Sequence, residues 1–331
     1  MTGQDHCGAS ERGFLRSLAR PLVRCYGIHG PSRGKHKILR AIIPGLLPAR
    51  RTIAKVRAPH GFTMCLDLSE AIQNQAYFFG YFESFLVPVF LEWAEPGSAV
   101  VDGGANFGQF SLLAAKVVGR EGLVLAYEPA AETFRDLQRN VELNDFRQVV
   151  CKNAALSNAT GYATLYVPQA RDSGTASLSR QAVVPYHREI AAAEVRLERL
   201  DDLLDTQVLG GRRVSLIKLD IQGAELEALH GSAALAETHR PVLIIEADEA
   251  TSSAFGYSPR DLCAYLVSLQ YSLFGVSPKK RGQLDPFNLE SGTPVPHDVV
   301  CIPKEGAREW GPHRLGRTEV PPRRQDSRVR G

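Results

Sequence analysis

The most constraining feature of this 331-residue sequence is an apolar strand that runs directly into a glycine turn headed by an acid, at residues 98–108. The segment reads Ser-Ala-Val-Val-Asp-Gly-Gly-Ala-Asn-Phe-Gly, so Asp102 ends the strand and Gly103 and Gly104 follow it. Glycines let the backbone turn tightly and approach a ligand closely, and a helix is predicted over 106–117. This order of strand, glycine turn and helix is typical of a cradle for a nucleotide-containing cofactor.

The spacing of the turn alone leaves the cofactor open. Gly103, Ala105 and Gly108 also fit a dinucleotide fingerprint of the G-x-A-x-x-G kind. A pyrophosphate needs bare backbone amides at a helix start, whereas S-adenosylmethionine carries a sulfonium and an ammonium, which the Asp102 carboxylate suits. Glu128 ends the next apolar strand and would hold the ribose hydroxyls of either cofactor. The alternative without a ligand is a strand-turn-helix whose glycines serve packing only.

Five apolar runs between residues 96 and 246 predict the strands of a parallel sheet. The runs show little polar alternation, as expected for strands buried on both faces. Helix-length amphipathic segments separate them, which favours a doubly wound α/β fold with helices on both faces. The predicted strands are 98–102, 123–128, 148–153, 214–220 and 242–246, and the predicted helices between them are 106–117, 131–143 and 224–235.

The gap between the third and fourth strands is about 60 residues long, far longer than a simple crossover. It contains strand-like pieces at 163–167 and 194–197, and we interpret 157–213 as an insertion near the ligand face. Beyond the fifth strand, a helix over 259–269 and strands over 271–276 and 298–302 would complete the sheet with an antiparallel edge pair.

The formal net charge of +3 conceals a strong separation of charge along the chain. Residues 1–57 carry 12 Lys and Arg against 2 Asp and Glu, and residues 307–331 carry 7 against 3. The other 20 bases and 31 acids lie in residues 58–306, which gives that segment a net charge of −11. We interpret 1–57 as a basic N-terminal extension with weak helical signals, 58–306 as the main domain and 307–331 as a basic disordered tail.

Composition also restricts the partners and the compartment. The basic ends lack the aromatic residues and motifs of nucleic-acid binding proteins, so no nucleic acid is expected, and peripheral contact with anionic membrane lipid is a weaker alternative to solvated tails. No apolar stretch is long enough for a transmembrane helix or a secretory signal. The six cysteines are scattered without a CxxC pair, which indicates reduced thiols and a cytoplasmic protein.

Four further motifs make a resemblance to a known family specific. The third predicted strand ends in Asn-Ala-Ala-Leu-Ser at 153–157, and the fourth ends in Ile-Lys-Leu-Asp-Ile-Gln-Gly-Ala-Glu at 217–225. Together with the glycine turn, Glu128-Pro129 and Ile245-Glu246, they closely resemble the FkbM family of S-adenosylmethionine-dependent methyltransferases over roughly residues 70–300. The resemblance implies a class I methyltransferase (Rossmann-like) fold, with a mostly parallel seven-stranded sheet and an antiparallel edge strand.

The resemblance also implies roles for individual residues, with S-adenosylmethionine as the cofactor. The methionine part would lie against Asp102, Gly103, Gly104, Asn106 and Gly108, the ribose against Glu128, the adenine against Asn153 and Ala154, and the transferred methyl beside Asp220. The aromatic segment 73–83 would form an arm over the cofactor, with Glu83 and Tyr81 as candidates, and the turn at 172–177 would border the acceptor. The family commonly has Glu where Gln222 stands here.

Lys218 interrupts a run predicted to be a buried strand, where an unpaired ammonium is costly. Asp220 shares its face two residues on, and Glu225 and Glu246 follow neighbouring strand ends, so an ion pair is expected. A purely structural pair and a direct catalytic role are both open. We take Asp220, Lys218 and Glu246 as the candidate catalytic residues.

Methyl transfer from a sulfonium is an in-line displacement, in which the protein chiefly aligns donor and acceptor and excludes water. A hydroxyl acceptor also needs a base, for which Asp220, His187 and Glu246 are candidates. No third carboxylate joins Asp220 and Glu246, so no metal is expected.

O-methylation of a hydroxyl on a small molecule, sugar or glycan is the favoured reaction. The fourth strand is not followed by Asn-Pro-Pro-Tyr or Asp-Pro-Pro-Tyr. Methyltransferases that act on nucleobase amines carry such a motif at that position. A nicotinamide-dependent oxidoreductase and a non-catalytic cofactor-binding scaffold are the alternatives. The first of these predicts a Tyr-x-x-x-Lys relay, which the Tyr162-x-x-x-Tyr166 segment does not supply.

Overall fold

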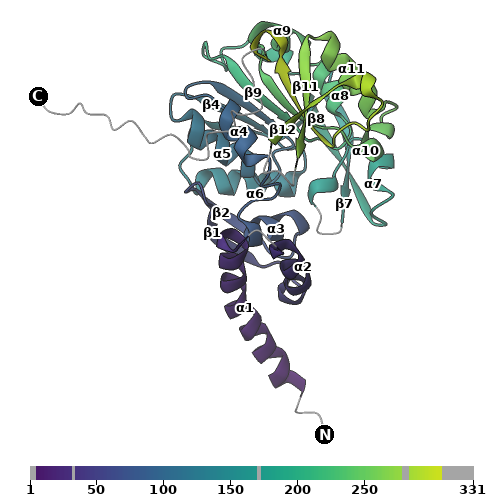
Figure 1. Ribbon diagram of the computed structural model, residues 1–331. Coiled ribbons are helices and arrows are strands. Elements are labelled where there is room, and N and C mark those ends of the chain that lie inside the picture. Colours follow the sequence, from purple (N-terminus) through teal and green to yellow (C-terminus); the bar gives the residue numbers. More distant parts are fainter. Residues whose placement is uncertain (1–4, 32–33, 170–172, 278–282, 308–331) are drawn as a thin grey trace, which may run out of the picture.

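A computed structural model describes residues 5–31, 34–169, 173–277 and 283–307 of the chain (Figure 1). Its centre is an eight-stranded sheet with the strand order β12-β11-β13-β10-β9-β3-β4-β5. Helices cover both faces of this sheet, while the N-terminal helix α1 projects away from it (Figure 1). The doubly wound α/β class predicted from the sequence is confirmed by this topology.

Five neighbouring strands, from β10 to the edge strand β5, are parallel and form one end of the sheet. They are β3 (Ala99–Gly103), β4 (Leu123–Tyr127), β5 (Val149–Lys152), β9 (Val214–Leu219) and β10 (Val242–Glu246). Each agrees to within one residue at either end with the strand predicted from its apolar run. Every residue of β3, β4 and β9 is buried, because helices cover these strands on both faces.

The other end of the sheet is built from three strands that pair antiparallel with one another. β13 (Asp298–Pro303) lies between β10 and β11 (Tyr271–Ser277), and β12 (Gln283–Phe287) forms the outer edge. The predicted count of seven strands was therefore wrong by one, and the antiparallel β13 is not at the edge. β12 escaped prediction because Asp285 and the exposed Pro286 break its apolar pattern, and a proline is tolerated in an edge strand.

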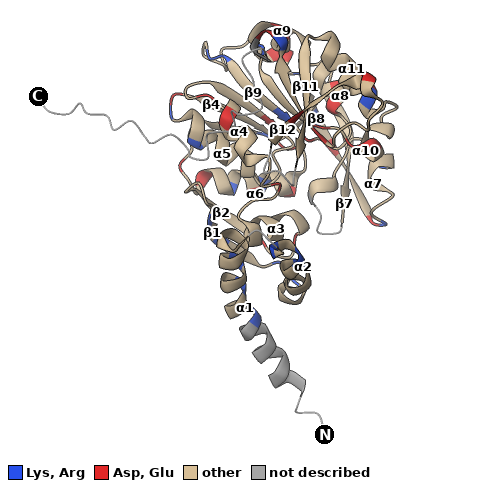
Figure 2. Cartoon of the chain, viewed as in Figure 1, with Lys and Arg blue, Asp and Glu red and all other residues tan. Residues whose placement is uncertain are grey.

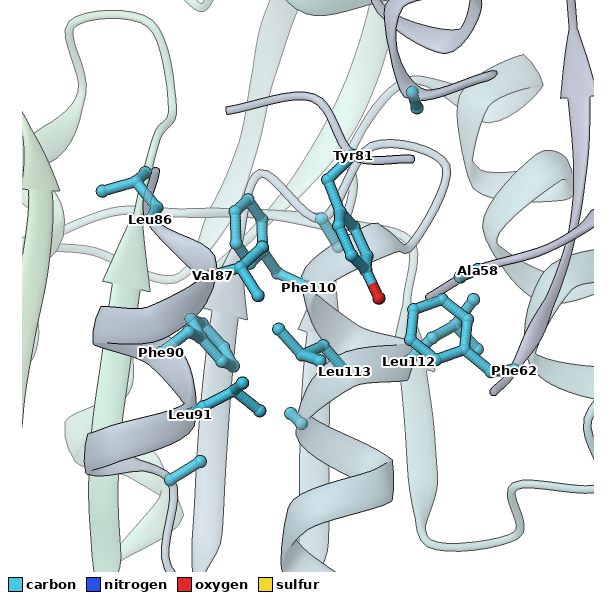
Figure 3. Packing of buried hydrophobic residues seen from close by; sticks show 14 of the residues in the cluster. Ala58, Phe62, Tyr81, Leu86, Val87, Phe90, Leu91, Phe110, Leu112 and Leu113 are labelled. Atoms are coloured by element: carbon cyan, nitrogen blue, oxygen red, sulfur yellow. The ribbon is translucent and has the colours of Figure 1, made fainter. Parts of the chain in front are cut away.

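Helices pack on the two faces of the sheet in separate hydrophobic clusters. Successive strand residues point to opposite faces, so Val100 of β3 joins one cluster and Val101 joins the other. Figure 3 shows the first cluster, where Phe90 meets Phe110 with ring centroids 5.2 Å apart. One face is covered by α4 (Val87–Trp93), α5 (Gln109–Val118) and α6 (Ala131–Glu142), and the other by α8 (Glu225–His230), α9 (Ala233–His239) and α11 (Pro259–Ser268).

Two of the predicted helices differ from the structure. α5 begins at Gln109 rather than at residue 106, because Asn106 and Gly108 have positive φ angles of 51° and 94°. The helix predicted over 224–235 is divided into α8 and α9 at Gly231. A Cβ atom on Gly231 would lie 2.0 Å from the carbonyl oxygen of Ser157, so the glycine lets another loop pass against this break.

The long segment between β5 and β9 forms a second sheet with the order β6-β8-β7. Its strands are β6 (Ala154–Leu156), β7 (Gly161–Pro168) and β8 (Ile190–Glu198), and the predicted pieces at 163–167 and 194–197 lie within β7 and β8. The short helices of this segment are η1 (Ser173–Thr175), α7 (Arg180–Val183) and η2 (Asp201–Leu203).

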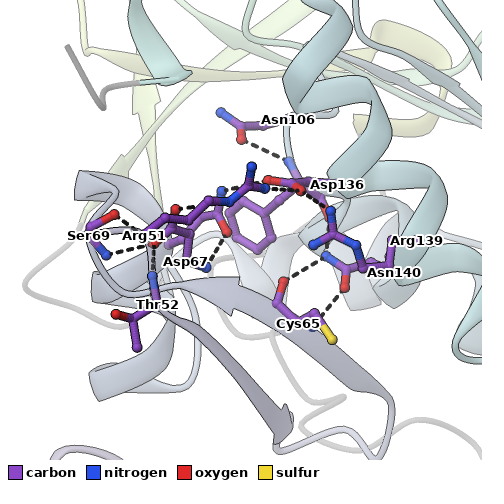
Figure 4. Close-up of polar contacts among 11 residues, drawn as sticks. Arg51, Thr52, Cys65, Asp67, Ser69, Asn106, Asp136, Arg139 and Asn140 are labelled. Carbon is purple, nitrogen blue, oxygen red and sulfur yellow. Dashed lines mark hydrogen bonds and ion pairs between the residues drawn. The ribbon is translucent and has the colours of Figure 1, made fainter. Parts of the chain in front are cut away.

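The chain before α4 forms two helices, a hairpin and a further helix. They are α1 (Asp5–His29), α2 (Lys35–Leu46), β1 (Ile53–Arg57), β2 (Thr63–Asp67) and α3 (Ala71–Phe79). The boundary placed at residue 57 thus falls within the β1–β2 hairpin. Asn140 of α6 accepts the Cys65 backbone N–H of this hairpin at 2.7 Å (Figure 4) and donates its own amide to the Phe107 carbonyl at 2.8 Å. One buried side chain therefore joins the hairpin to the glycine turn.

The remaining helical segments are short: α10 (Glu249–Ser253), η4 (Leu289–Ser291) and α12 (Lys304–Ala307). Within the described ranges, no helix combines the length and the apolar character that crossing a membrane requires. The basic tail was predicted over 307–331, and residues 308–331 of it lie outside the described residues.

Candidate active site

A cavity of about 270 Å³ opens at the carboxyl ends of β3, β4 and β9, the edge where open α/β sheets bind ligands. Its walls come from the glycine turn, the ends of β4 and β9, the start of β6, the η1 segment and the chain between α3 and α4. Eight of the predicted site residues line it: Glu83, Gly104, Asn106, Glu128, Ala154, Lys218, Asp220 and Glu246.

The glycine turn is held between the two neighbouring strands. The backbone N–H groups of Gly104 and Ala105 both donate to the Tyr127 carbonyl at the end of β4, at 3.0 and 2.9 Å. On the other side, a Cβ atom on Gly104 would lie 1.9 Å from the Asp220 carbonyl oxygen. Only glycine fits there, and the turn presents bare backbone to the cavity.

Four predicted site residues lie beneath or beside the cavity rather than in its wall: Asp102, Gly103, Gly108 and Asn153. Asp102 is buried, and its Oδ2 accepts a hydrogen bond from Ser111 at 2.5 Å. Its Oδ1 has no hydrogen-bond partner among the described residues, and burial raises the pKa of this carboxyl. Asn153 donates its amide to the carbonyls of Glu128 and Pro129, at 2.9 and 3.0 Å, and so fixes the end of β4.

Glu128 places a buried carboxyl at the end of β4. Its Oε2 accepts the Asn106 backbone N–H at 3.0 Å, and its Oε1 accepts that of Ala130 at 2.9 Å. Burial raises its pKa to about 7 despite these two bonds. Each carboxylate oxygen can accept a second hydrogen bond, so Glu128 retains capacity to hold a pair of hydroxyls.

Lys218 and Asp220 form a buried ion pair at the end of β9, with 2.8 Å between Nζ and Oδ2. Burial alone would lower the pKa of Lys218, but the charges of Asp220, Asp102 and Glu83 raise it above its ordinary value. Burial would likewise raise the pKa of Asp220, but the Lys218 ammonium lowers it below the usual range. The ammonium also lies 5.1 Å from the centre of the Phe110 ring. Both members of the pair are therefore charged at neutral pH.

Glu83 and Glu246 surround this pair with two further carboxyls. Burial and the charge of Asp220 raise the pKa of Glu83 to about 8 and raise the pKa of Glu246 well above its ordinary value. Gln222 donates its Nε2 amide to Glu246 Oε2 at 2.9 Å, and the same atom lies 3.5 Å from Asp220 Oδ1. The cluster thus combines one anion and one cation with two carboxyls that retain protons near neutral pH.

The turn after β9 is fixed by Glu225, which the sequence placed near Lys218. Its two oxygens accept the backbone N–H groups of Ile221 and Gly223 at 2.8 and 3.0 Å. Burial raises its pKa to about 7. Glu225 is absent from the cavity wall, so it positions the turn that carries Gln222.

Two other candidates from the sequence do not line the cavity. Tyr81 is buried and bonds through its hydroxyl to His60 Nδ1 at 2.7 Å. His187 Nε2 lies 2.8 Å from the hydroxyl of Thr175, which does line the cavity. Of the predicted acceptor turn at 172–177, residues 174–177 line the cavity, while residue 172 lies outside the described residues.

Sequence reasoning missed several residues at the site. Ile72 and Phe82 line the cavity from the segment before β3, and no motif marked them. His297, which lies just before β13, has its Nε2 3.6 Å from Glu246 Oε1. A hydrogen bond with Asp298 raises the pKa of His297 to about 9. In the described part of the chain, no group of three or more His, Cys, Asp or Glu side chains is arranged to hold a metal ion.

Comparison with known proteins gives a match to one family. The family model described as Methyltransferase FkbM domain matches residues 102–273. Methyltransferase 1 of Beauveria bassiana (strain ARSEF 2860) is 30% identical over 146 residues, and Methyltransferase sdnD of Sordaria araneosa is 33% identical over 154 residues. Each alignment covers 40% of this chain, and the chain spans 58% and 59% of the length of these two relatives.

Among solved structures, the FkbM methyltransferase of Methylobacillus flagellatus KT has 19% sequence identity and a TM-score of 0.39. The alignment covers 62% of this chain and 44% of that one.

Proposed function

Because the chain belongs to the FkbM methyltransferase family, we propose that it transfers the methyl group of S-adenosylmethionine to a hydroxyl of a small molecule, sugar or glycan. The observation that carries this proposal is the carboxyl-rich lining of the cavity at the ends of β3, β4 and β9. Among its described lining residues, four carry a carboxyl group, and Lys218 alone carries an ammonium, which Asp220 neutralises. This carboxyl-rich lining suits a ligand with a sulfonium and an ammonium, because the positive charges of such a ligand would lower the pKa values of the neighbouring carboxyls and favour their ionised forms.

The residues present fit this cofactor better than a dinucleotide. A pyrophosphate requires free amides at a helix start or unpaired basic side chains. The backbone amides that lead into α5 are instead already bonded, since those of Asn106, Phe107 and Gly108 donate to Glu128 Oε2, Asn106 Oδ1 and the Ala105 carbonyl. Glu128 would hold the ribose diol, and Ala154, Ala155 and Leu156 offer an apolar wall for a flat base.

The bound cofactor would supply an electrophilic methyl group on a positively charged sulfur. The described residues would orient the acceptor hydroxyl and remove its proton. Lys218 holds Asp220 in its ionised form through Oδ2, so Asp220 Oδ1 is free of that ion pair and can take the proton. Glu246 retains its own proton and can donate a hydrogen bond to a polar group of the acceptor molecule near the reacting oxygen. The cavity walls exclude water from the reaction.

Methyl transfer is tested by incubating the purified chain with isotopically labelled S-adenosylmethionine and a panel of sugar and small-molecule hydroxyl acceptors, with mass spectrometry as the readout. Asp220→Asn should lower the turnover rate by about 10²–10⁴-fold, the usual range for a lost general base. Asp261→Asn is the matched control, because Asp261 caps α11 on the surface, away from the cavity.

Calorimetry with S-adenosylmethionine, S-adenosylhomocysteine and NAD(H) separates the alternatives. Binding of the two sulfur nucleotides that is weakened in Glu128→Ala supports the proposal. Binding of NAD(H) alone would overturn it in favour of an oxidoreductase. Tight binding of S-adenosylmethionine without turnover on any acceptor would favour a scaffold.

A further inference from the structure

The segment from Arg12 to Leu66 contains 12 Lys and Arg residues and no Asp or Glu. It covers most of α1, all of α2 and most of the β1–β2 hairpin. In Figure 2, the described parts of α1, α2 and β1 carry blue positions and no red ones. The rest of the molecule has the opposite balance, since residues 58–306 have a net charge of −11. Such a division gives the protein a positive end and a negative body.

Some of these basic residues join α1 and α2 to each other, and Arg24 joins α1 to α3 and β1. Arg20 donates to the Leu46 carbonyl at 2.9 Å, Arg24 to the carbonyls of Tyr77 and Arg57, and Lys35 to the Gly27 carbonyl at 2.7 Å. Arg16, Lys37, Arg40 and Arg50 are exposed instead. The basic residues of this segment therefore include exposed ones that no hydrogen bond to a backbone carbonyl of the described residues explains.

Both helices are also apolar on two faces, although the body covers only one face of each. On α2, Leu39, Ile43 and Leu46 are buried in the core. Ile38 and Ile42, one helical turn apart, remain 47% and 43% exposed.

The same arrangement recurs on α1. Ala19, Val23 and Tyr26 pack against the core, while Leu18 and Leu22, again one turn apart, are 56% and 74% exposed. Four large aliphatic side chains are thus uncovered on two adjoining helices amid exposed basic residues. We call the exposed side chains Leu18, Leu22, Lys37, Ile38, Arg40 and Ile42 of these two helices together the basic-apolar surface.

We propose that the basic-apolar surface docks on a phospholipid bilayer that contains anionic headgroups. Aliphatic side chains flanked by Lys and Arg are the combination that lies in the headgroup region of a membrane, with the apolar groups buried and the cations on the phosphates. A second copy of the chain fits poorly, because two positive surfaces would face each other across a symmetric contact. Nucleic acid would satisfy the charge but would leave the four aliphatic side chains exposed to water.

The proposal is tested by flotation of the full chain with vesicles of equimolar phosphatidylcholine and phosphatidylserine, and with vesicles of phosphatidylcholine alone. The chain is expected to float with the anionic vesicles only, and less so as sodium chloride is raised, because salt screens surface charges. Equal binding to both kinds of vesicle, or binding to neither, would overturn the proposal.

Two pairs of variants separate the charge from the apolar contribution. Lys37→Glu with Arg40→Glu should weaken binding by about 25-fold or more, at about fivefold for each basic residue lost. Arg120→Glu with Arg188→Glu, at exposed positions outside α1 and α2, is the matched control and should cause a smaller change.

Leu22→Ser with Ile42→Ser should weaken binding by about tenfold or more, whereas Val267→Ser, on the half-exposed side of α11, should not weaken it.

Circular dichroism and binding of S-adenosylmethionine report whether each variant is folded, so a loss of lipid binding is read only in folded protein. Variants that bind vesicles as tightly as their matched controls would overturn the proposal. Binding to a homopolymeric RNA that phosphatidylserine vesicles do not displace would favour nucleic acid as the partner of this surface. Self-association that Leu22→Ser abolishes, without vesicle binding, would favour a second copy.

Discussion

The carbonyl oxygen of Asp220 lies 1.9 Å from the point that a Cβ atom would occupy on Gly104, so the turns that follow β3 and β9 touch with no side chain between them. Gly104 also has a φ of +75°, a backbone conformation that L side chains rarely adopt. The two turns carry opposite halves of the proposed site, and their separation is set by this backbone contact. Whatever moves one turn therefore changes the position of the other.

Replacement of Gly104 by alanine is expected to separate the two turns. The clash with backbone adds to the cost of the positive φ, so the loss in free energy of unfolding should exceed the ~1 kcal/mol typical of the conformational cost alone. S-adenosylmethionine affinity should fall by about tenfold or more. Gly119→Ala is the control, since Gly119 has a φ of +71° and no heavy atom within 4 Å of its Cβ position. Equal losses in urea unfolding and calorimetry for the two variants would contradict the role of the contact.

Stability without cofactor is expected to fall as the pH rises from about 4.5 to about 8. Burial raises the pKa of Glu83 to about 8 and those of Glu128 and Glu225 to about 7, from 4.5 in each case. Their folded forms bind protons more tightly than their unfolded forms. The associated stability is present below about pH 4.5 and is lost as the pH passes through the folded pKa values. For Glu128 this amounts to on the order of 3 kcal/mol.

Urea unfolding at a series of pH values measures this slope, and Glu128→Gln should reduce it. A stability that rises over the same range would show that these carboxyls are ionised in the folded protein at neutral pH.

Removal of the Lys218 charge should be costly, and removal of the whole ion pair less so. Lys218→Met leaves the half-buried Asp220 without a counter-charge, so the loss should be somewhat below the ~3–5 kcal/mol that is typical of a fully buried pair. The double variant Lys218→Met/Asp220→Asn should recover part of that stability but no methyl transfer. A double-mutant cycle by chemical denaturation gives the coupling energy, and a coupling near zero would mean that the two charges do not depend on each other.

Exchange of Gln222 for glutamate tests the amide that lies between two carboxyls. The substitution replaces the donor to Glu246 with a fourth acid near Asp220 and Glu83, which should raise the pKa values of its neighbours. The acidic limb of the pH profile of methyl transfer should move to higher pH. Gln75→Glu, on the exposed side of α3, is the matched control. An unshifted profile in Gln222→Glu would mean that this amide does not influence the ionisation of the site.

The sequence predicted the parts of the fold whose causes are local. The central strands β3, β4 and β9 coincide with apolar runs, because strands buried on both faces must be apolar throughout. The break between α8 and α9 could not be predicted in this way. It depends on the approach of Ser157 to Gly231, two residues that are far apart in the chain. The edge strand β12 was missed for a related reason, since pairing with β11 compensates for its weak apolar pattern.

The same distinction between local and long-range causes applies to the residues of the site. The residues at strand ends could be placed near one another from the sequence, because the carboxyl ends of parallel strands meet at one edge. His297 could not, because its approach to Glu246 requires that β13 return antiparallel beside β10. Sequence spacing also cannot distinguish a residue in the cavity wall from one beneath it. Asp102 and Glu128 both stand at strand ends, yet only Glu128 reaches the wall.

The wall of the cavity has two origins in the chain. Ile72 comes from α3, and Phe82 and Glu83 come from the segment between α3 and α4; all three precede the matched residues 102–273. The matched residues therefore supply Lys218, Asp220 and Glu246, while Glu83 and one side of the opening come from the chain before them. An exchange of this segment alone between two relatives is the smallest graft that would change which acceptors can enter.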